Sequence, residues 1–120
     1  MAELKNIIAR CKTSNISLDK LCKIKKYLPI REKFRFLKEY DTIVEKHLMD
    51  YIGYESFVAF IFFNLMIVKE YTDIELELSY DEFDMLQEYG LIDKIVNFIG
   101  EDYSLLLGLV QSENVQSKPE

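Results

Sequence analysis

The sequence has 120 residues, the length of one domain, and its 49% hydrophobic and 30% charged residues indicate a globular chain rather than a disordered one. Four Gly and two Pro are too few for a turn-rich β-barrel. The formal net charge of −6 argues against a dedicated nucleic-acid-binding domain, because such domains are usually basic as a whole.

The N-terminal part predicts two short helices. In residues 2–11, apolar side chains recur at i, i+3, i+4 and i+7, which is the spacing of an amphipathic helix. These side chains are Leu4, Ile7, Ile8 and Cys11. The polar residues 13–15 interrupt the pattern, and Ser17 is a candidate N-cap for the next helix. The apolar residues expected on that helix are Leu21, Ile24 and Leu28.

A longer helix is predicted from about Pro29 to about Met49. Proline suits the first turn of a helix, and Gly53 is a candidate for the left-handed residue that follows the last turn. The apolar face of this helix is broad, which suits packing between two neighbours. The residues expected on it are Ile30, Phe34, Leu37, Val44 and Leu48, widened by Phe36, Tyr40 and Ile43.

Residues 54–71 predict the central helix of the fold, because they are apolar on nearly every side. Phe60 and Phe63 are expected to be buried in it, and Asn64 is expected to make one hydrogen bond to another helix. The apolar run 57–68 would extend about 18 Å as a helix. A membrane span needs about 30 Å, so a buried core helix is favoured over a membrane helix.

The C-terminal part begins with residues 73–78, where apolar and acidic residues alternate as in an extended segment or short strand without an evident partner. Ser79 and Glu82 form a capping-box pattern at the start of the next helix. Gly90 and Gly100 separate two further short helices, and residues 111–120 are expected to be a flexible tail. The sequence as a whole therefore predicts an all-α fold, a single compact domain of five to six helices around the helix at about 54–71.

Charge is distributed unevenly along the chain. Residues 1–40 hold eleven Lys and Arg against four Asp and Glu, whereas residues 41–120 hold four against seventeen. This asymmetry indicates a basic N-terminal helical arm over residues 1–28 and an acidic helical body over residues 29–110, followed by the tail. Opposite charge on two faces suits head-to-tail association of copies.

The basic segment is the candidate partner-binding site. Its proposed contact residues are Lys20, Lys23, Lys25, Lys26, Arg31 and Arg35. We expect them to contact an acidic surface of another subunit or partner protein. Two alternatives stay open, a contact with nucleic acid and a merely solvated lysine face.

The sequence contains no known catalytic or metal-binding motif. Cys11 and Cys22 lack the spacing of a zinc site and are expected to be free intracellular thiols. His47 is the single histidine, and we expect it to be a partly exposed interface residue. The acidic residues between 73 and 84 lack the spacing of a calcium-binding loop and are interpreted as solvated carboxylates. The expectation is therefore a protein that is not an enzyme and has no cofactor and no metal.

Three short segments carry a resemblance to known proteins. They are residues 26–33 (KYLPIREK), 69–74 (KEYTDI) and 89–95 (YGLIDKI). In this order they resemble small uncharacterised proteins of tailed bacteriophages that infect low-GC Gram-positive bacteria. The heavy use of isoleucine and lysine over arginine suits such an AT-rich genome. The resemblance implies a bacteriophage context and carries over no site residues.

Together these observations predict a non-enzymatic structural or assembly protein that acts through protein–protein contacts, as a bacteriophage virion component of the head, neck or tail region. Its expected partners are other protein subunits, in a homo-oligomer or larger assembly, without a membrane. Its expected location is the host cytoplasm during assembly and the virion thereafter. The alternative is an acidic, phage-encoded inhibitor or adaptor that binds a basic surface of a host protein.

Overall fold

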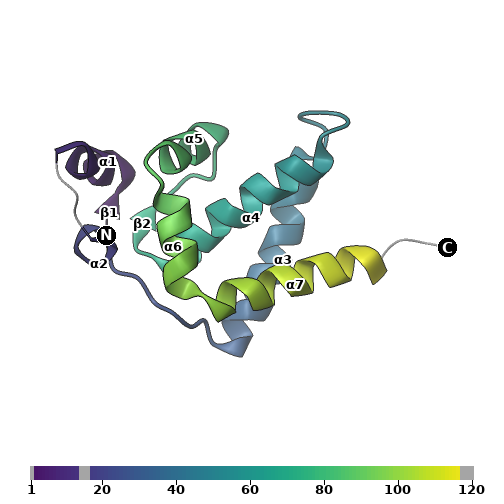
Figure 1. Cartoon of the computed structure of the whole chain (residues 1–120). Helices are drawn as coiled ribbons and strands as arrows, with labels where there is room; N and C mark the ends of the chain where they lie inside the picture. The colour runs from purple at the N-terminus through teal and green to yellow at the C-terminus, as the bar shows by residue number, and fades with distance from the viewer. Residues whose placement is uncertain (1, 14–16, 117–120) are drawn as a thin grey trace.

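The computed structural model describes residues 2–13 and 17–116, and most of these residues are helical (Figure 1). The helices are α1 (Leu4–Thr13), α2 (Leu18–Leu21), α3 (Ile30–His47), α4 (Glu55–Tyr71), α5 (Tyr80–Glu88), α6 (Leu91–Ile99) and α7 (Glu101–Gln116). Two strands of two residues each are β1 (Ala2–Glu3) and β2 (Ile74–Glu75). The predicted all-α fold is confirmed. None of the described helices is both long and apolar enough to cross a membrane.

Helix α4 is the central element, as its composition predicts. It packs against α3, α5 and α6, and every residue from 61 to 68 is buried. Phe63 is 1% exposed and meets Phe36, Tyr40 and Tyr103 edge to face. The burial predicted for Phe60 is wrong. That side chain is 46% exposed, although Val58 in the same turns is 1% exposed, so its side of the helix and not its position along α4 decides its burial. Phe83 is its single aromatic contact among the described residues.

Helix α3 buries only part of the apolar face that the spacing predicts, with Leu37, Ile43 and Val44 partly buried against the core. Phe36 and Tyr40 face the core, whereas Ile30 and Phe34 are exposed. The inward stripe also contains Lys33, which is 2% exposed and forms a buried ion pair with Asp102 at the start of α7. The spacing of apolar residues could not predict this burial, because Lys33 is charged and its partner is distant in the sequence.

The helix predicted after Ser17 is only one turn long. Helix α2 ends at Leu21, and the chain then runs extended beside the segment that follows α4. The Lys25 N–H donates to the Tyr71 carbonyl at 2.9 Å, and the Asp73 N–H donates to the Lys23 carbonyl at 3.1 Å. These bonds satisfy the backbone in an extended conformation, so the helix predicted through residue 28 does not form.

The extended segment predicted at residues 73–78 is present and does have a partner. Ala2 pairs with Ile74 and Glu3 with Glu75 in a parallel register. Residues 2 and 3 therefore form a strand, and the first helix begins at Leu4 instead of at residue 2. This short pairing ties the N-terminal helix to the body of the fold (Figure 1).

The predicted caps and stops of the C-terminal helices are correct. The Ser79 hydroxyl accepts from the Glu82 N–H, and the Glu82 carboxylate accepts from the Ser79 N–H, which is a complete capping box. Gly90 and Gly100 have φ of 67° and 64°, a region that glycine enters without strain. Helix α7 continues to Gln116, so residues 111–116 are helical and not part of the predicted tail. Residues 117–120, and the interruption predicted at 14–15, lie outside the described residues.

Candidate protein-docking site

The turn between α3 and α4, together with the first turns of α4, exposes an unusual number of large apolar side chains. They are Met49, Tyr51, Ile52, Tyr54, Phe57 and Phe60. The Tyr54 side chain, for example, is 68% exposed. Single exposed apolar residues are common on proteins, but a contiguous stretch of this kind marks a surface that another molecule covers.

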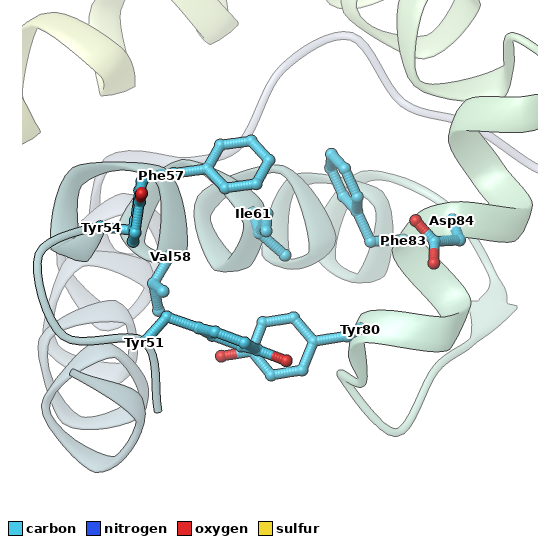
Figure 2. A pocket seen from close by; sticks show the side chains of 8 residues that line it. All are labelled: Tyr51, Tyr54, Phe57, Val58, Ile61, Tyr80, Phe83 and Asp84. Atoms are coloured by element: carbon cyan, nitrogen blue, oxygen red, sulfur yellow. The ribbon is translucent and has the colours of Figure 1, made fainter. Parts of the chain in front are cut away.

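Three of these side chains, Tyr51, Tyr54 and Phe57, form one wall of a pocket of about 270 Å³ (Figure 2). We call it the aromatic pocket. Its lining residues are Tyr51, Tyr54, Phe57, Val58, Ile61, Tyr80, Phe83 and Asp84. Figure 2 shows Phe57 and Phe83 reaching toward each other from α4 and α5, with the rings of Tyr51 and Tyr80 crossing on the opposite side. The Asp84 carboxylate lies at the α5 end of the pocket.

A hydrogen-bonded group holds α5 against the end of α3 beside the pocket. The Tyr80 hydroxyl donates to Asp50 Oδ2 at 2.7 Å, and His47 Nδ1 lies 2.8 Å from the same oxygen. The His47 ring stacks on Phe62, with the two centroids 4.2 Å apart. The Tyr80 and His47 hydrogen bonds lower the pKa of Asp50, while burial and the Asp50 carboxylate raise the pKa of Tyr80.

This group positions the pocket, and neither cysteine belongs to it. His47 has no hydrogen bond or ring contact with either cysteine in the part of the chain that is described. Cys22 is buried, and burial, with a contribution from Asp73, raises the pKa of its thiol to about 11. His47 is half-buried, which agrees with the partial exposure predicted for it, while its interface role stays a prediction. Its neighbour Tyr80 lines the pocket.

The surroundings of the aromatic pocket are acidic. Between Lys46 and Lys94 the sequence contains one basic residue, Lys69, and many carboxylates. Asp81 and Asp84 are exposed on α5, and neither forms an ion pair or hydrogen bond with a residue that the structure describes. Their charge is therefore available to a partner that carries lysine or arginine.

The six predicted contact residues are all exposed. They are Lys20 of α2, Lys23, Lys25 and Lys26 of the extended segment, and Arg31 and Arg35 of α3. Arg35 pairs with Glu32 at 2.9 Å, and the Lys26 ammonium lies over the Phe98 ring at 5.1 Å. The other four side chains make no ion pair within the described parts of the chain, so the basic segment is not neutralised by the acidic body of its own molecule.

The structure adds exposed apolar residues to this basic segment, two of which, Ile30 and Phe34, the sequence pattern placed on the apolar packing face of the helix. Tyr27, Ile30 and Phe34 are each more than half exposed. Ile30 and Phe34 are four residues apart on α3 and therefore share a face of the helix. We call the set Tyr27, Ile30, Arg31, Phe34 and Arg35 the basic–apolar face.

Two further expectations concern polar groups. Asn64 is buried and accepts a hydrogen bond from the Tyr103 hydroxyl at 2.9 Å, which confirms the predicted link between helices. Within residues 2–13 and 17–116, no three His, Cys, Asp or Glu side chains are grouped so as to hold a metal ion.

No protein family, curated protein or solved structure matches this chain. The resemblance to bacteriophage proteins therefore stays a prediction, and the case for function depends on the aromatic pocket and the basic–apolar face.

Proposed function

We propose that this protein is a non-enzymatic structural or assembly protein that acts through protein–protein contacts, with the aromatic pocket as its principal docking site. The observation that carries the proposal is the run of exposed apolar residues from Met49 to Phe60, which continues into a formed pocket. Leaving this surface in water is unfavourable by about 25 cal/mol per Å² of apolar area. A partner that covers it gains that free energy.

The size and chemistry of the aromatic pocket favour a protein side chain as its occupant. Its volume of about 270 Å³ lies just below the range of roughly 300–1,000 Å³ that is typical of small-molecule sites. The polar groups in its lining are tyrosine hydroxyls and the single carboxylate of Asp84. Aromatic residues of this kind are enriched at protein interfaces. Nucleic acid is disfavoured here, because the surrounding carboxylates repel phosphates.

The bacteriophage context belongs to the same proposal and is supported by the three resembling segments. In this context the protein acts in the host cytoplasm during assembly and becomes part of the virion, in the head, neck or tail region. The alternative, an acidic inhibitor or adaptor of a basic host protein, is favoured by the unpaired carboxylates of Asp81 and Asp84. Mass spectrometry of purified particles separates the two, because a virion component is present in fixed copy number and an inhibitor is absent.

Short peptides test the docking function of the aromatic pocket directly. One series carries a single Phe between two Lys residues, and the matched series carries the same Phe between two Glu residues. We expect the first series to shift the NMR signals of Tyr54, Phe57 and Phe83, and the second to shift them far less. If neither series perturbs the pocket at millimolar concentration, the proposed docking function is wrong.

A further inference from the structure

We infer that the aromatic pocket of one copy receives the basic–apolar face of a second copy, so that the chain assembles head to tail. This inference rests on the proposed docking function and names the partner. It joins two exposed apolar surfaces that lie at opposite ends of α3. The argument depends on the chemistry of each surface, on their charges and on their separation.

The basic–apolar face has the form of a docking element. Ile30 and Phe34 project from one side of the first turns of α3, and Phe34 is 59% exposed. Arg31 and Arg35 occupy the adjacent stripe of the same helix, since they too are four residues apart. An apolar anchor flanked by arginines is the composition that protein interfaces favour at their centres.

The aromatic pocket complements this face in both apolar character and charge. Its walls are aromatic, and it offers the unpaired carboxylate of Asp84, with Asp81 one turn earlier on α5. An apolar side chain from α3 of the second copy would enter between Phe57 and Phe83, while Arg31 or Arg35 would meet the carboxylates. Opposite charges around an apolar centre favour this orientation over one that brings two pockets, or two basic faces, together.

The two surfaces of one molecule cannot meet each other. The basic–apolar face lies at the N-terminal end of α3. The loop that contributes to the pocket follows the C-terminal end of the same helix (Figure 1). Helix α3 has 18 residues, which at 1.5 Å per residue separates its ends by about 27 Å. The contact must therefore join different copies. Because it joins unlike surfaces, it produces a ring or an open chain of subunits and not a closed symmetric dimer.

Two double variants test the two surfaces one at a time without changing their charge. Ile30→Gln with Phe34→Gln removes the apolar anchors of the basic–apolar face, and Tyr54→Gln with Phe57→Gln removes those of the pocket. All four side chains are exposed, so the fold should be retained. The matched control is Leu105→Gln with Leu109→Gln, which changes two exposed apolar side chains of α7 outside both surfaces. Circular dichroism and urea unfolding check the fold of each variant.

Light scattering over a range of protein concentrations measures the assembly. We expect the wild type and the α7 control to exceed the monomer mass of 14.2 kDa as concentration rises. Each surface variant alone should dissociate at least about tenfold more readily. An equimolar mixture of the two surface variants should form a one-to-one dimer and nothing larger, because each copy retains one of the two complementary surfaces.

Four results would overturn the inference. A wild type that stays monomeric at about 1 mM rejects self-association, and the peptide experiment then still decides whether the pocket docks another protein. Full assembly of one surface variant by itself, with loss of assembly in the other, indicates a contact between like surfaces. Equal loss of assembly in the α7 control indicates non-specific apolar association. Binding of a labelled DNA duplex by a monomeric wild type would place nucleic acid on the basic segment instead.

Discussion

The ammonium group of Lys33 lies 3.2 Å from the carboxylate of Asp102, and both side chains are buried. The same carboxylate oxygen accepts hydrogen bonds from the Leu28 N–H at 2.7 Å and from the Tyr71 hydroxyl at 2.8 Å. Lys33 also donates to the Leu28 carbonyl. Asp102 therefore joins the segment before α3, the end of α4 and the start of α7, and it orients the end of α3 that carries the basic–apolar face.

Removing Asp102 should destabilise the fold more than removing Lys33. Asp102→Ala leaves a buried ammonium and two buried donors without their acceptor, which costs about 3–5 kcal/mol. Lys33→Met should cost less, because Asp102 keeps the Leu28 N–H and the Tyr71 hydroxyl. The free energy of unfolding in urea measures both changes.

The double variant serves as the control for this pair. Adding Lys33→Met to Asp102→Ala removes the uncompensated ammonium, so the double variant should be more stable than Asp102→Ala alone. Equal losses for the two single variants would contradict the central position given to the Asp102 carboxylate.

Acid should weaken this network. Burial raises the pKa of Asp102, but the Leu28 N–H, the Tyr71 hydroxyl and Lys33 together outweigh it and hold that pKa below the ordinary value. The contribution of a depressed carboxyl pKa is present above the unfolded value of about 4 and is lost as pH falls through the folded value. Between about pH 6 and pH 3, the wild type should therefore lose more unfolding free energy than Asp102→Asn. A difference in unfolding free energy between the two proteins that stays constant over this pH range would refute the prediction.

Phe63 and Phe60 should respond very differently to truncation, although both are phenylalanines of α4. Phe63→Ala opens a cavity among Phe36, Tyr40 and Tyr103 and should cost about 3–5 kcal/mol. Phe60→Ala should cost less than about 1 kcal/mol, because that side chain is almost half exposed. Urea unfolding of the two variants measures the contrast. Similar losses would mean that another surface covers Phe60 in solution.

The elements that local chemistry determines could be predicted from sequence. The apolar run of α4, the capping box at Ser79 and the positive φ at Gly90 each depend on residues within a few positions of one another. Their predicted positions agree with the structure to within a residue or two. No distant partner is needed to form them.

The elements that depend on distant partners could not be predicted in this way. Ile24 and Leu28 fit a helical stripe, but the backbone between them pairs with the segment after α4. Lys33 fits a solvated basic face, but Asp102 is far away in the sequence and draws it into the core. The aromatic pocket was missed for the same reason, since it forms only where the α3–α4 turn meets α5. The one available signal was the apolar run 51–60, in which Glu55 is the single acidic residue and other polar residues are few.

The basic segment should contribute to assembly through its summed charge. Changing Lys23, Lys25 and Lys26 together to Glu should leave the fold intact, because all three are exposed and none forms an ion pair with a described residue. Single exposed pairs contribute only about 0–1 kcal/mol, so the triple change is needed to produce a measurable loss. Assembly of the wild type should also weaken between about 0.1 M and 1 M NaCl, as the screening length falls from about 10 Å to 3 Å.

Two results would contradict this role of the lysines. Unchanged association of the folded triple variant at low salt would show that the segment is a solvated face. Nucleic acid that is retained by the wild type and released by the triple variant would show that the partner is not a protein.

The central claim is that one copy inserts its basic–apolar face into the aromatic pocket of another, and disulfide formation between copies tests it most directly. One copy carries Phe34→Cys and the other carries Tyr54→Cys, both with Cys11→Ser, while the buried Cys22 is left in place. Under mild oxidation we predict a covalent dimer of the two different copies, in clear excess over the control pair Leu109→Cys with Tyr54→Cys. A yield no greater than that of the control pair would contradict the account.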